Sequence, residues 1–159
     1  MKTKLNDEKI LLQQLTINDS LIFHSLYFPS GRDKQNLAAE ETKTPIEFTK
    51  HIISLCNNIF TIRLIDNPTK IIGECALHDL NKERKEIEIG GTLFPEYWGQ
   101  GIMASAFQIL IEFAKQEYAV NKIIAKTEIT NDKALRFADK LGFKKITQND
   151  QTIILEKMI

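Results

Sequence analysis

The stretch "PEYWGQGIMA", residues 95–104, lies between a strand-like segment and the longest helix-like segment, and it decides how the chain is interpreted. Gly99 and Gly101 stand one residue apart at the point where the helix should begin. The first amides of a helix have no intrahelical partner, and the helix dipole is positive at that end. Glycine also lets the backbone approach an anion closely, so the corner is either a phosphate cradle or only a tight turn.

The residues before the corner predict a strand over 86–94, "EIEIGGTLF", because apolar side chains alternate along it. The adjacent Gly90 and Gly91 indicate either a β-bulge or a close approach of the backbone to another segment. The two faces of this strand differ, with Ile87, Ile89, Gly91 and Leu93 on one and Glu88, Gly90 and Thr92 on the other.

The residues after the corner predict a helix over 101–119, with Met103, Phe107 and Leu110 facing the core. A strand follows over 121–129. The segment "TNDKALRFADKLG" then predicts a helix that Asn131 caps and Gly142 ends. The last segments, "FKKIT" and "QTIILEKM", predict a closing hairpin.

The first half of the chain predicts two helices and three strands. The strands span 9–15, 59–66 and 71–80. One helix starts at Asn18 or Asp19 and runs to about residue 28, and the second starts at Thr44. The second helix carries one apolar stripe, formed by Phe48, Ile52 and Leu55. With no repeat or linker, residues 1–159 are expected to form a single α/β domain.

Composition excludes several classes of partner. Twenty-one basic residues balance twenty-one acidic ones, so no net field favours nucleic acid or an anionic membrane. No apolar run approaches the roughly 18 residues that span a bilayer, and the N-terminus lacks an apolar targeting segment, so we expect a cytoplasmic protein.

Cys56 and Cys75 stand in apolar surroundings and are expected to be reduced core residues. The histidines form no ligand motif, so no metal is expected.

The corner lacks the lysine of a Walker motif and the third glycine of a dinucleotide site, which argues against both. With its neighbours it resembles the GNAT superfamily of N-acetyltransferases, in the branch that acetylates ribosomal-protein N-termini. Four segments carry this resemblance: "IIGECAL", "IEIGGTLFPEYWGQGIMASA", "TNDKALRFADKLGF" and, more loosely, "ILLQQLTINDS".

The resemblance implies an α/β (α+β) fold with a twisted, mostly antiparallel sheet, flanked by helices, in which two neighbouring parallel strands, 86–94 and 121–129, splay apart. Acetyl-CoA would enter the splay as co-substrate. Its pantetheine arm would pair near Thr92, Leu93 and Phe94. Asn131 would contact the cofactor from the cap of the following helix. The pyrophosphate would lie on the amides of Gly99, Gln100, Gly101, Ile102, Met103 and Ala104.

The chain departs from the family at several positions. Trp98 and Met103 replace the first and last residues of the family's Gln/Arg-x-x-Gly-x-Gly/Ala motif, and Ser105 stands where this branch has a glutamate. Ala134 and Ala138 occupy the positions of the usual general acid, a serine or tyrosine. Because a thiol pKa of about 8.5 makes thiolate a tolerable leaving group, water could supply the missing proton.

The same resemblance suggests catalytic groups. Glu88 is the candidate base or water-positioning group, or else a structural carboxylate, and the Leu93 backbone amide would hold the oxyanion. Glu74 and His78 share one face of the neighbouring strand and would line the acceptor pocket.

Other positions receive simpler interpretations. Trp98 is expected to pack against the sheet rather than stack on adenine, and Lys144 and Lys145 to form a surface pair. The polar loop before Thr44 is either the acceptor mouth or a solvated connection, and its charged residues are Arg32, Asp33, Glu40 and Glu41.

The function indicated is acetyl transfer from acetyl-CoA to a primary amine, by direct attack through a tetrahedral intermediate. The amine would belong to a protein N-terminus or a small molecule. The alternative is a non-catalytic CoA-binding module for sensing or scaffolding, motivated by Ala134 and Ala138. A phosphate-binding corner unrelated to CoA is a third possibility. The protein is expected to be a monomer or a homodimer.

Overall fold

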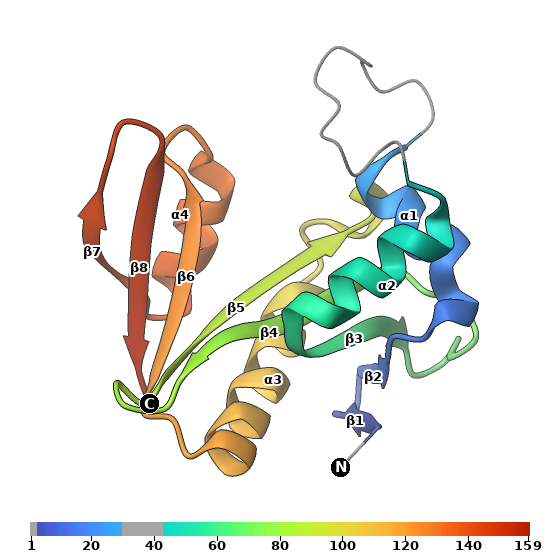
Figure 1. The fold of residues 1–159 in the computed structure, drawn as a ribbon, viewed down its shortest axis with the longest axis horizontal. Coiled ribbons are helices and arrows are strands. Elements are labelled where there is room, and N and C mark those ends of the chain that lie inside the picture. Colours follow the sequence, from blue (N-terminus) through green and yellow to red (C-terminus); the bar gives the residue numbers. More distant parts are fainter. Residues whose placement is uncertain (1–2, 30–42) are drawn as a thin grey trace.

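A computed structural model describes residues 3–29 and 43–159, which form one eight-stranded sheet with helices on both faces (Figure 1). The strand order is β1-β2-β3-β4-β5-β6-β8-β7. Only β5 and β6 pair in parallel; the other neighbours are antiparallel. The predicted mixed, mostly antiparallel sheet is therefore confirmed. Its strands are Lys4–Asn6 (β1), Ile10–Gln14 (β2), Cys56–Leu64 (β3), Gly73–Asn81 (β4), Glu86–Leu93 (β5), Lys122–Glu128 (β6), Lys144–Gln148 (β7) and Thr152–Met158 (β8).

The parallel pair is short and then opens. β5 pairs with β6 only where residues 86–88 face residues 122–124. Beyond this point β5 stays with β4 up to Leu93, while β6 stays with β8 up to Glu128. Figure 1 shows the two strands diverging from the end where they meet. The predicted splay is present, and it leaves the far half of β5 without a partner on that side.

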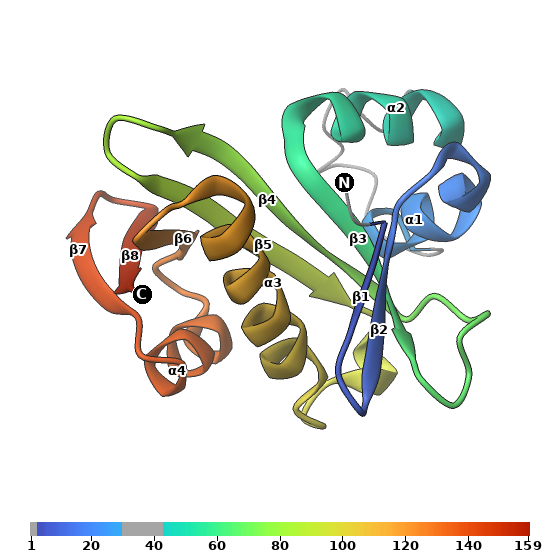
Figure 2. The same ribbon diagram turned by 90° about the horizontal axis from the view of Figure 1, so that it is seen from below.

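Four α-helices cover the two faces of the sheet in the described chain (Figure 2). α1 and α2 lie over one face, where Phe23 and Phe48 pack with Ile59 of β3. α3 crosses the other face and buries Leu110 there, in the larger of the two hydrophobic cores. α4 lies beside α3, and Phe107 of α3 contacts Phe137 of α4. The bounds of these helices are Ser20–Tyr27 (α1), Pro45–Leu55 (α2), Ile102–Tyr118 (α3) and Asp132–Lys140 (α4).

Local hydrogen bonds and one glycine mark the ends of the predicted helices. The Thr44 hydroxyl accepts from the Glu47 amide at 3.1 Å, and Asn131 Oδ1 accepts from the Ala134 amide at 3.1 Å, so both residues act as N-caps. Gly142, with φ of 90°, follows the end of α4. Asp19 precedes α1, but its carboxylate accepts from the amide of Thr16, the residue that caps the short 3-10 helix before α1.

Two glycines set how closely β4, β5 and α3 approach one another. The β4–β5 register runs unbroken from Gly73 to His78, so the predicted bulge at Gly90–Gly91 is absent from this pair. The other possibility, a close approach, is present: a Cβ on Gly91 would lie 2.8 Å from the Met103 sulfur. A Cβ on Gly73 would lie 2.4 Å from the Thr92 carbonyl oxygen. A side chain at Gly73 would meet backbone atoms, whereas a side chain at Gly91 would have to displace the end of the Met103 side chain.

Several predictions about the fold are wrong in detail. β1 was not expected, and β3 begins at Cys56 rather than residue 59, because polar Asn57 and Asn58 concealed its start. The stripe on α2 ends early, since the Leu55 side chain is 60% exposed. Trp98, expected to pack against the sheet, is 55% exposed and contacts β5 through its indole nitrogen. Along residues 3–29 and 43–159, we find no helix that has the length and apolar character needed to span a membrane.

Candidate functional site

The glycine corner joins the end of β5 to the start of α3. Gly99 and Gly101 both have φ of 77°, a left-handed conformation that strains any residue with a side chain. The Ser105 amide donates to the Gly101 carbonyl at 3.1 Å and begins the helical ladder. The amides ahead of it, from Ile102 to Ala104, have no acceptor within the helix. The corner therefore presents a row of backbone donors at the positive end of a 17-residue helix.

Two lysines that the sequence did not single out flank this corner. Lys9 Nζ donates to the Gln100 carbonyl at 2.6 Å, and Lys133 Nζ lies 5.1 Å from the Trp98 ring centroid. Lys9 is 91 residues away from Gln100 in sequence, so no local pattern could connect them. Both cations add positive charge to a site already suited to an anion.

The expected cofactor residues lie along the splay and the corner. The exposed Trp98 indole donates from Nε1 to the Leu93 carbonyl at 3.1 Å and ties the corner to the end of β5. Phe94 donates to Ile72 O and accepts from the Tyr97 amide, both at 3.0 Å, so its backbone groups are already engaged. Asn131 is exposed at the start of α4.

A pocket of about 390 Å³ lies on the face of the sheet that carries α1 and α2. Glu74 and His78, the two residues expected to line an acceptor pocket, both line it. Its wall continues along β5 to Thr92, beside the splay. The other lining residues come from α1, α2, β3, β4 and β5 and are Tyr27, Ile52, Leu55, Cys56, Ile59, Ala76, Asp79, Gly90 and Gly91.

Glu74 is the buried charged group of this pocket. Its side chain is 3% exposed, and its strand partner across β4–β5 is Thr92. The Tyr27 hydroxyl donates to Glu74 Oε1, and Thr92 supplies a second side-chain hydrogen bond. Burial raises the pKa of Glu74 to about 7, although the two hydrogen bonds act in the opposite direction. No Lys, Arg or His side chain within residues 3–29 and 43–159 forms an ion pair with it.

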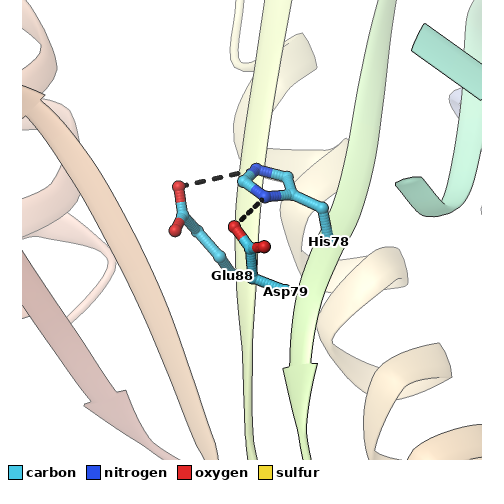
Figure 3. A group of neighbouring side chains, drawn as sticks. All are labelled: His78, Asp79 and Glu88. Carbon is cyan, nitrogen blue, oxygen red and sulfur yellow. Dashed lines mark hydrogen bonds and ion pairs between the residues drawn. The ribbon is translucent and has the colours of Figure 1, made fainter. Parts of the chain in front are cut away.

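Glu88 lies in a different environment (Figure 3). His78 stands between two carboxylates, with Nε2 at 3.5 Å from Glu88 Oε2 and Nδ1 at 2.9 Å from Asp79 Oδ2. Lys126 Nζ lies 3.2 Å from Glu88 Oε1. Glu88 lines a separate cavity of about 330 Å³ towards β6 and β8, and Asp79 borders both cavities. Both oxygens of Glu88 therefore already have nitrogen partners.

The same three side chains could be considered as a metal site, because ligand atoms of His78, Asp79 and Glu88 lie within 4.8 Å of one another. The Lys126 ammonium group already supplies positive charge beside Glu88. We therefore interpret the cluster as a network of ion pairs.

The cysteines are free, and their surroundings differ. Cys75 is fully buried in the larger core, as expected, whereas Cys56 is only half-buried and lines the pocket. Burial, followed by the negative charges of Glu74 and Asp79, raises the pKa of the Cys56 thiol to about 11. A thiol that stays protonated is a poor nucleophile, so Cys56 is unsuited to carry an acyl group.

The remaining predictions concern the two alanines at the general-acid positions, a lysine pair and the polar loop. Ala138 is buried in the core and Ala134 is half-buried, so neither position offers a proton donor. Lys144 and Lys145 are exposed, as predicted for a surface pair. The loop residues named as a possible acceptor mouth lie outside the described residues; they are Arg32, Asp33, Glu40 and Glu41.

Comparison with known proteins gives a family. A family model described as "Acetyltransferase (GNAT) domain" matches residues 9–144. The chain is 31% identical over 88 residues to an uncharacterized N-acetyltransferase p20 of Bacillus licheniformis, covering 55% of this chain and 49% of that protein. It is 29% identical over 73 residues to a putative ribosomal N-acetyltransferase, YdaF, of Bacillus subtilis, covering 46% and 40%. The matched part thus spans half or less of these relatives.

Solved structures share the whole fold. One described as "Apo FdhC- a nucleotide-linked sugar GNAT" superposes with a TM-score of 0.84 at 18% identity, covering 99% of this chain and 91% of that one. The ribosomal L7/L12 alpha-N-protein acetyltransferase RimL, in complex with coenzyme A, gives a TM-score of 0.79 at 14% identity and covers 96% of both chains.

Proposed function

Since the chain belongs to the family of GNAT acetyltransferase domains, we propose that it transfers the acetyl group of acetyl-CoA to a primary amine. One observation carries this proposal: the parallel pair β5–β6 opens, and the free part of β5 leads directly into the left-handed glycines at the start of α3. An extended thiol arm fits an unpaired strand edge, and a pyrophosphate fits a helix N-terminus.

In the proposed complex, the pantetheine arm pairs with Thr92 and Leu93, and the pyrophosphate binds the amides of residues 99–104. Lys9 and Lys133 are close enough to the corner to balance the phosphate charge. Asn131, at the cap of α4, contributes a further contact. The coenzyme A bound by RimL, which has the same fold, supports this choice of co-substrate.

The proposed reaction is direct attack of the amine nitrogen on the thioester carbonyl. The amide of Leu93 stabilises the oxyanion of the tetrahedral intermediate, and the CoA thiolate leaves and is protonated by water. The protonated Cys56 thiol supports this single-step route over an acyl-enzyme. The harder step is to obtain a neutral amine, because an amine of pKa about 10.4 is neutral roughly once in 2,500 molecules at pH 7.

Glu88 has a positioning role in this proposal, holding His78 and a water molecule beside the splay. Its contacts with Lys126 and His78 support that role over the base role. Glu88→Gln should then lower kcat/KM by about tenfold, equally for amines of low and high pKa. A loss that grows with the pKa of the amine would instead identify Glu88 as the base.

The competing function, a non-catalytic CoA-binding module, is favoured by the alanines at 134 and 138, which provide no proton donor. Two measurements on the same chain separate the functions: thermal stabilisation by CoA, and thiol release from acetyl-CoA with a panel of peptide and small-molecule amines. We expect both stabilisation and acceptor-dependent release. Stabilisation without release for any amine would support the binding module, and the absence of both would reject CoA as the ligand.

A further inference from the structure

We propose that Glu74 binds the acceptor's ammonium group and removes its proton, and that the acceptor is a small monoamine with an apolar body. This inference rests on the proposed function, because it assigns the amine that attacks the thioester. It names a residue and an acceptor class that the family membership does not supply.

The first argument is the missing counter-charge. A carboxylate that is removed from water is costly unless a cation or several hydrogen bonds stabilise it. Glu74 is 3% exposed and has the hydroxyls of Tyr27 and Thr92 as partners, but no ion pair with a cationic side chain of the described residues. Glu88, by contrast, has Lys126 at 3.2 Å. A bound ammonium ion would give Glu74 a positively charged partner, as Lys126 does for Glu88.

The second argument is position. Glu74 pairs across the β4–β5 ladder with Thr92, and Thr92 is one of the two residues proposed to pair with the pantetheine arm. The arm would lie along the opposite edge of β5, so the thioester would be about two strand spacings from the Glu74 backbone, roughly 10 Å. An amine bound between the Glu74 carboxylate and the thioester bridges this distance.

The third argument is the composition of the pocket wall. Part of the wall is apolar, formed by Ile52, Leu55 and Ile59, and the exposed Leu55 side chain gains a partner if an apolar group enters. A volume of about 390 Å³ is within the usual range for small-molecule sites. One ammonium group at Glu74 and an apolar remainder satisfy this part of the wall.

Four other titratable groups line the pocket around Glu74. They are Tyr27 on α1, Cys56 at the start of β3, and His78 and Asp79 on β4. Burial raises the pKa of Tyr27 above its ordinary value and that of Cys56 to about 11, so both remain neutral near pH 7. Asp79 and His78 are bonded to each other at 2.9 Å, which leaves Glu74 to meet the amine.

The proposed step balances. The acceptor binds as R–NH₃⁺ and transfers one proton to the Glu74 carboxylate. The neutral nitrogen forms a C–N bond with the thioester carbon, and the C–S bond breaks as the intermediate collapses. A second proton leaves the nitrogen and, through water, reaches the CoA sulfur, while the proton on Glu74 is released to solvent. The products are R–NH–acetyl, CoA–SH and one proton.

The test is the pH dependence of kcat/KM with 2-phenylethylamine as acceptor, in the full chain and in Glu74→Gln. The full chain should show an acidic limb with a midpoint near pH 7, matching the pKa of about 7 of Glu74. In Glu74→Gln this limb should disappear, and activity should rise with pH up to the pKa of the amine. At pH 7 the loss should be about 100-fold. Glu112→Gln, an exposed change on α3, is the matched control and should keep the limb.

Tyr27→Phe gives an independent variant. Because the Tyr27 hydrogen bond lowers the pKa of Glu74, its removal should move the acidic limb to higher pH. The acceptor class is tested by comparing 2-phenylethylamine with spermidine and with a tripeptide that has a free N-terminus. The monoamine should have the highest kcat/KM, and a clear preference for either of the other two would overturn the proposed class.

Failure of this inference differs from failure of the proposed function. If the full chain shows no acceptor-dependent thiol release, the transferase proposal itself fails. If the full chain is active but Glu74→Gln retains the acidic limb and stays within about threefold of full activity, Glu74 is not the base. Thermal stabilisation of the CoA complex by 2-phenylethylamine, lost in Glu74→Gln, gives a binding readout that does not depend on turnover.

Discussion

The glycine corner and the pocket that contains Glu74 both adjoin β5, yet they are built in different ways. The corner consists of consecutive residues, Gly99 to Ala104, and acts through backbone amides and a helix dipole. The pocket takes side chains from α1, α2, β3, β4 and β5. A backbone site depends on conformation, so few substitutions other than those at its glycines should affect it. A side-chain site depends on the chemistry of single residues such as Glu74.

The largest expected effect tests the backbone character of the corner. Gly101→Val should weaken CoA binding by about 100-fold, roughly 3 kcal/mol, because φ of 77° is strained for valine and the amides must shift. Gly142→Val is the matched control. Gly142 also has a positive φ, 90°, but it follows the C-terminal end of α4 and is not part of the corner. Titration calorimetry with CoA measures both variants. Equal affinity in Gly101→Val and the parent chain would show that the pyrophosphate binds elsewhere.

The next effect tests the buried charge of the pocket through stability. Because folding raises the pKa of Glu74 from 4.5 to about 7, the folded state binds more protons than the unfolded state between these pH values. The contribution of Glu74 to stability is therefore full below the unfolded pKa and is lost as pH rises through 7, by about 3 kcal/mol.

Glu74→Gln removes this titration. The free energy of unfolding of Glu74→Gln, measured in urea relative to the parent chain, should increase between about pH 4.5 and pH 8. Glu112→Gln should show no such trend. A constant difference between Glu74→Gln and the parent would mean that Glu74 titrates normally in the folded protein.

A smaller effect concerns the frame that both regions share. Gly73→Ala should reduce stability by about 2 kcal/mol, because its Cβ would lie 2.4 Å from the Thr92 carbonyl oxygen and a backbone atom cannot easily move away. Gly90→Ala, one strand away, has no atom within 4 Å of its Cβ and serves as the control. Urea denaturation midpoints compare them. Similar midpoints would show that the two strands separate at little cost.

The smallest effect concerns the charge around the corner. Lys9→Met should reduce CoA affinity by less than about tenfold and make it less sensitive to salt, since Lys9 is an exposed cation that is screened by ions. Its contact with the Gln100 carbonyl is a single hydrogen bond of 2.6 Å. Affinity measured at two salt concentrations provides the test, and an unchanged salt dependence would exclude Lys9 from the phosphate site.

Sequence was sufficient wherever one local rule decides the structure. The alternation in 86–94, the cap at Thr44 and the glycines before α3 each depend on neighbouring residues, and each prediction is confirmed. The family resemblance added the splay, which no local pattern shows. The start of β3 was missed because the burial of Asn58 is decided by tertiary contacts, among them its hydrogen bond with the Tyr118 hydroxyl.

The pocket could be predicted only in part. Glu74 and His78 were named because they share one face of a strand, but nothing in the sequence connects Tyr27 with Glu74, 47 residues later. The exposure of Trp98 and Leu55 has the same origin. Leu55 is the last residue of α2, and Trp98 directly follows the short 3-10 helix Pro95–Tyr97. Whether such a terminal residue faces the core is set by packing between elements distant in sequence.

The contact between Gly91 and Met103 has an evolutionary consequence. Gly91 borders the pocket, Met103 lies in the first turn of α3, and a Cβ at 91 would fall 2.8 Å from the methionine sulfur. A lineage that gains a side chain at 91 must therefore shorten or redirect the one at 103. These two positions should covary among relatives, so a change of acceptor and an adjustment of the cofactor site would be inherited together.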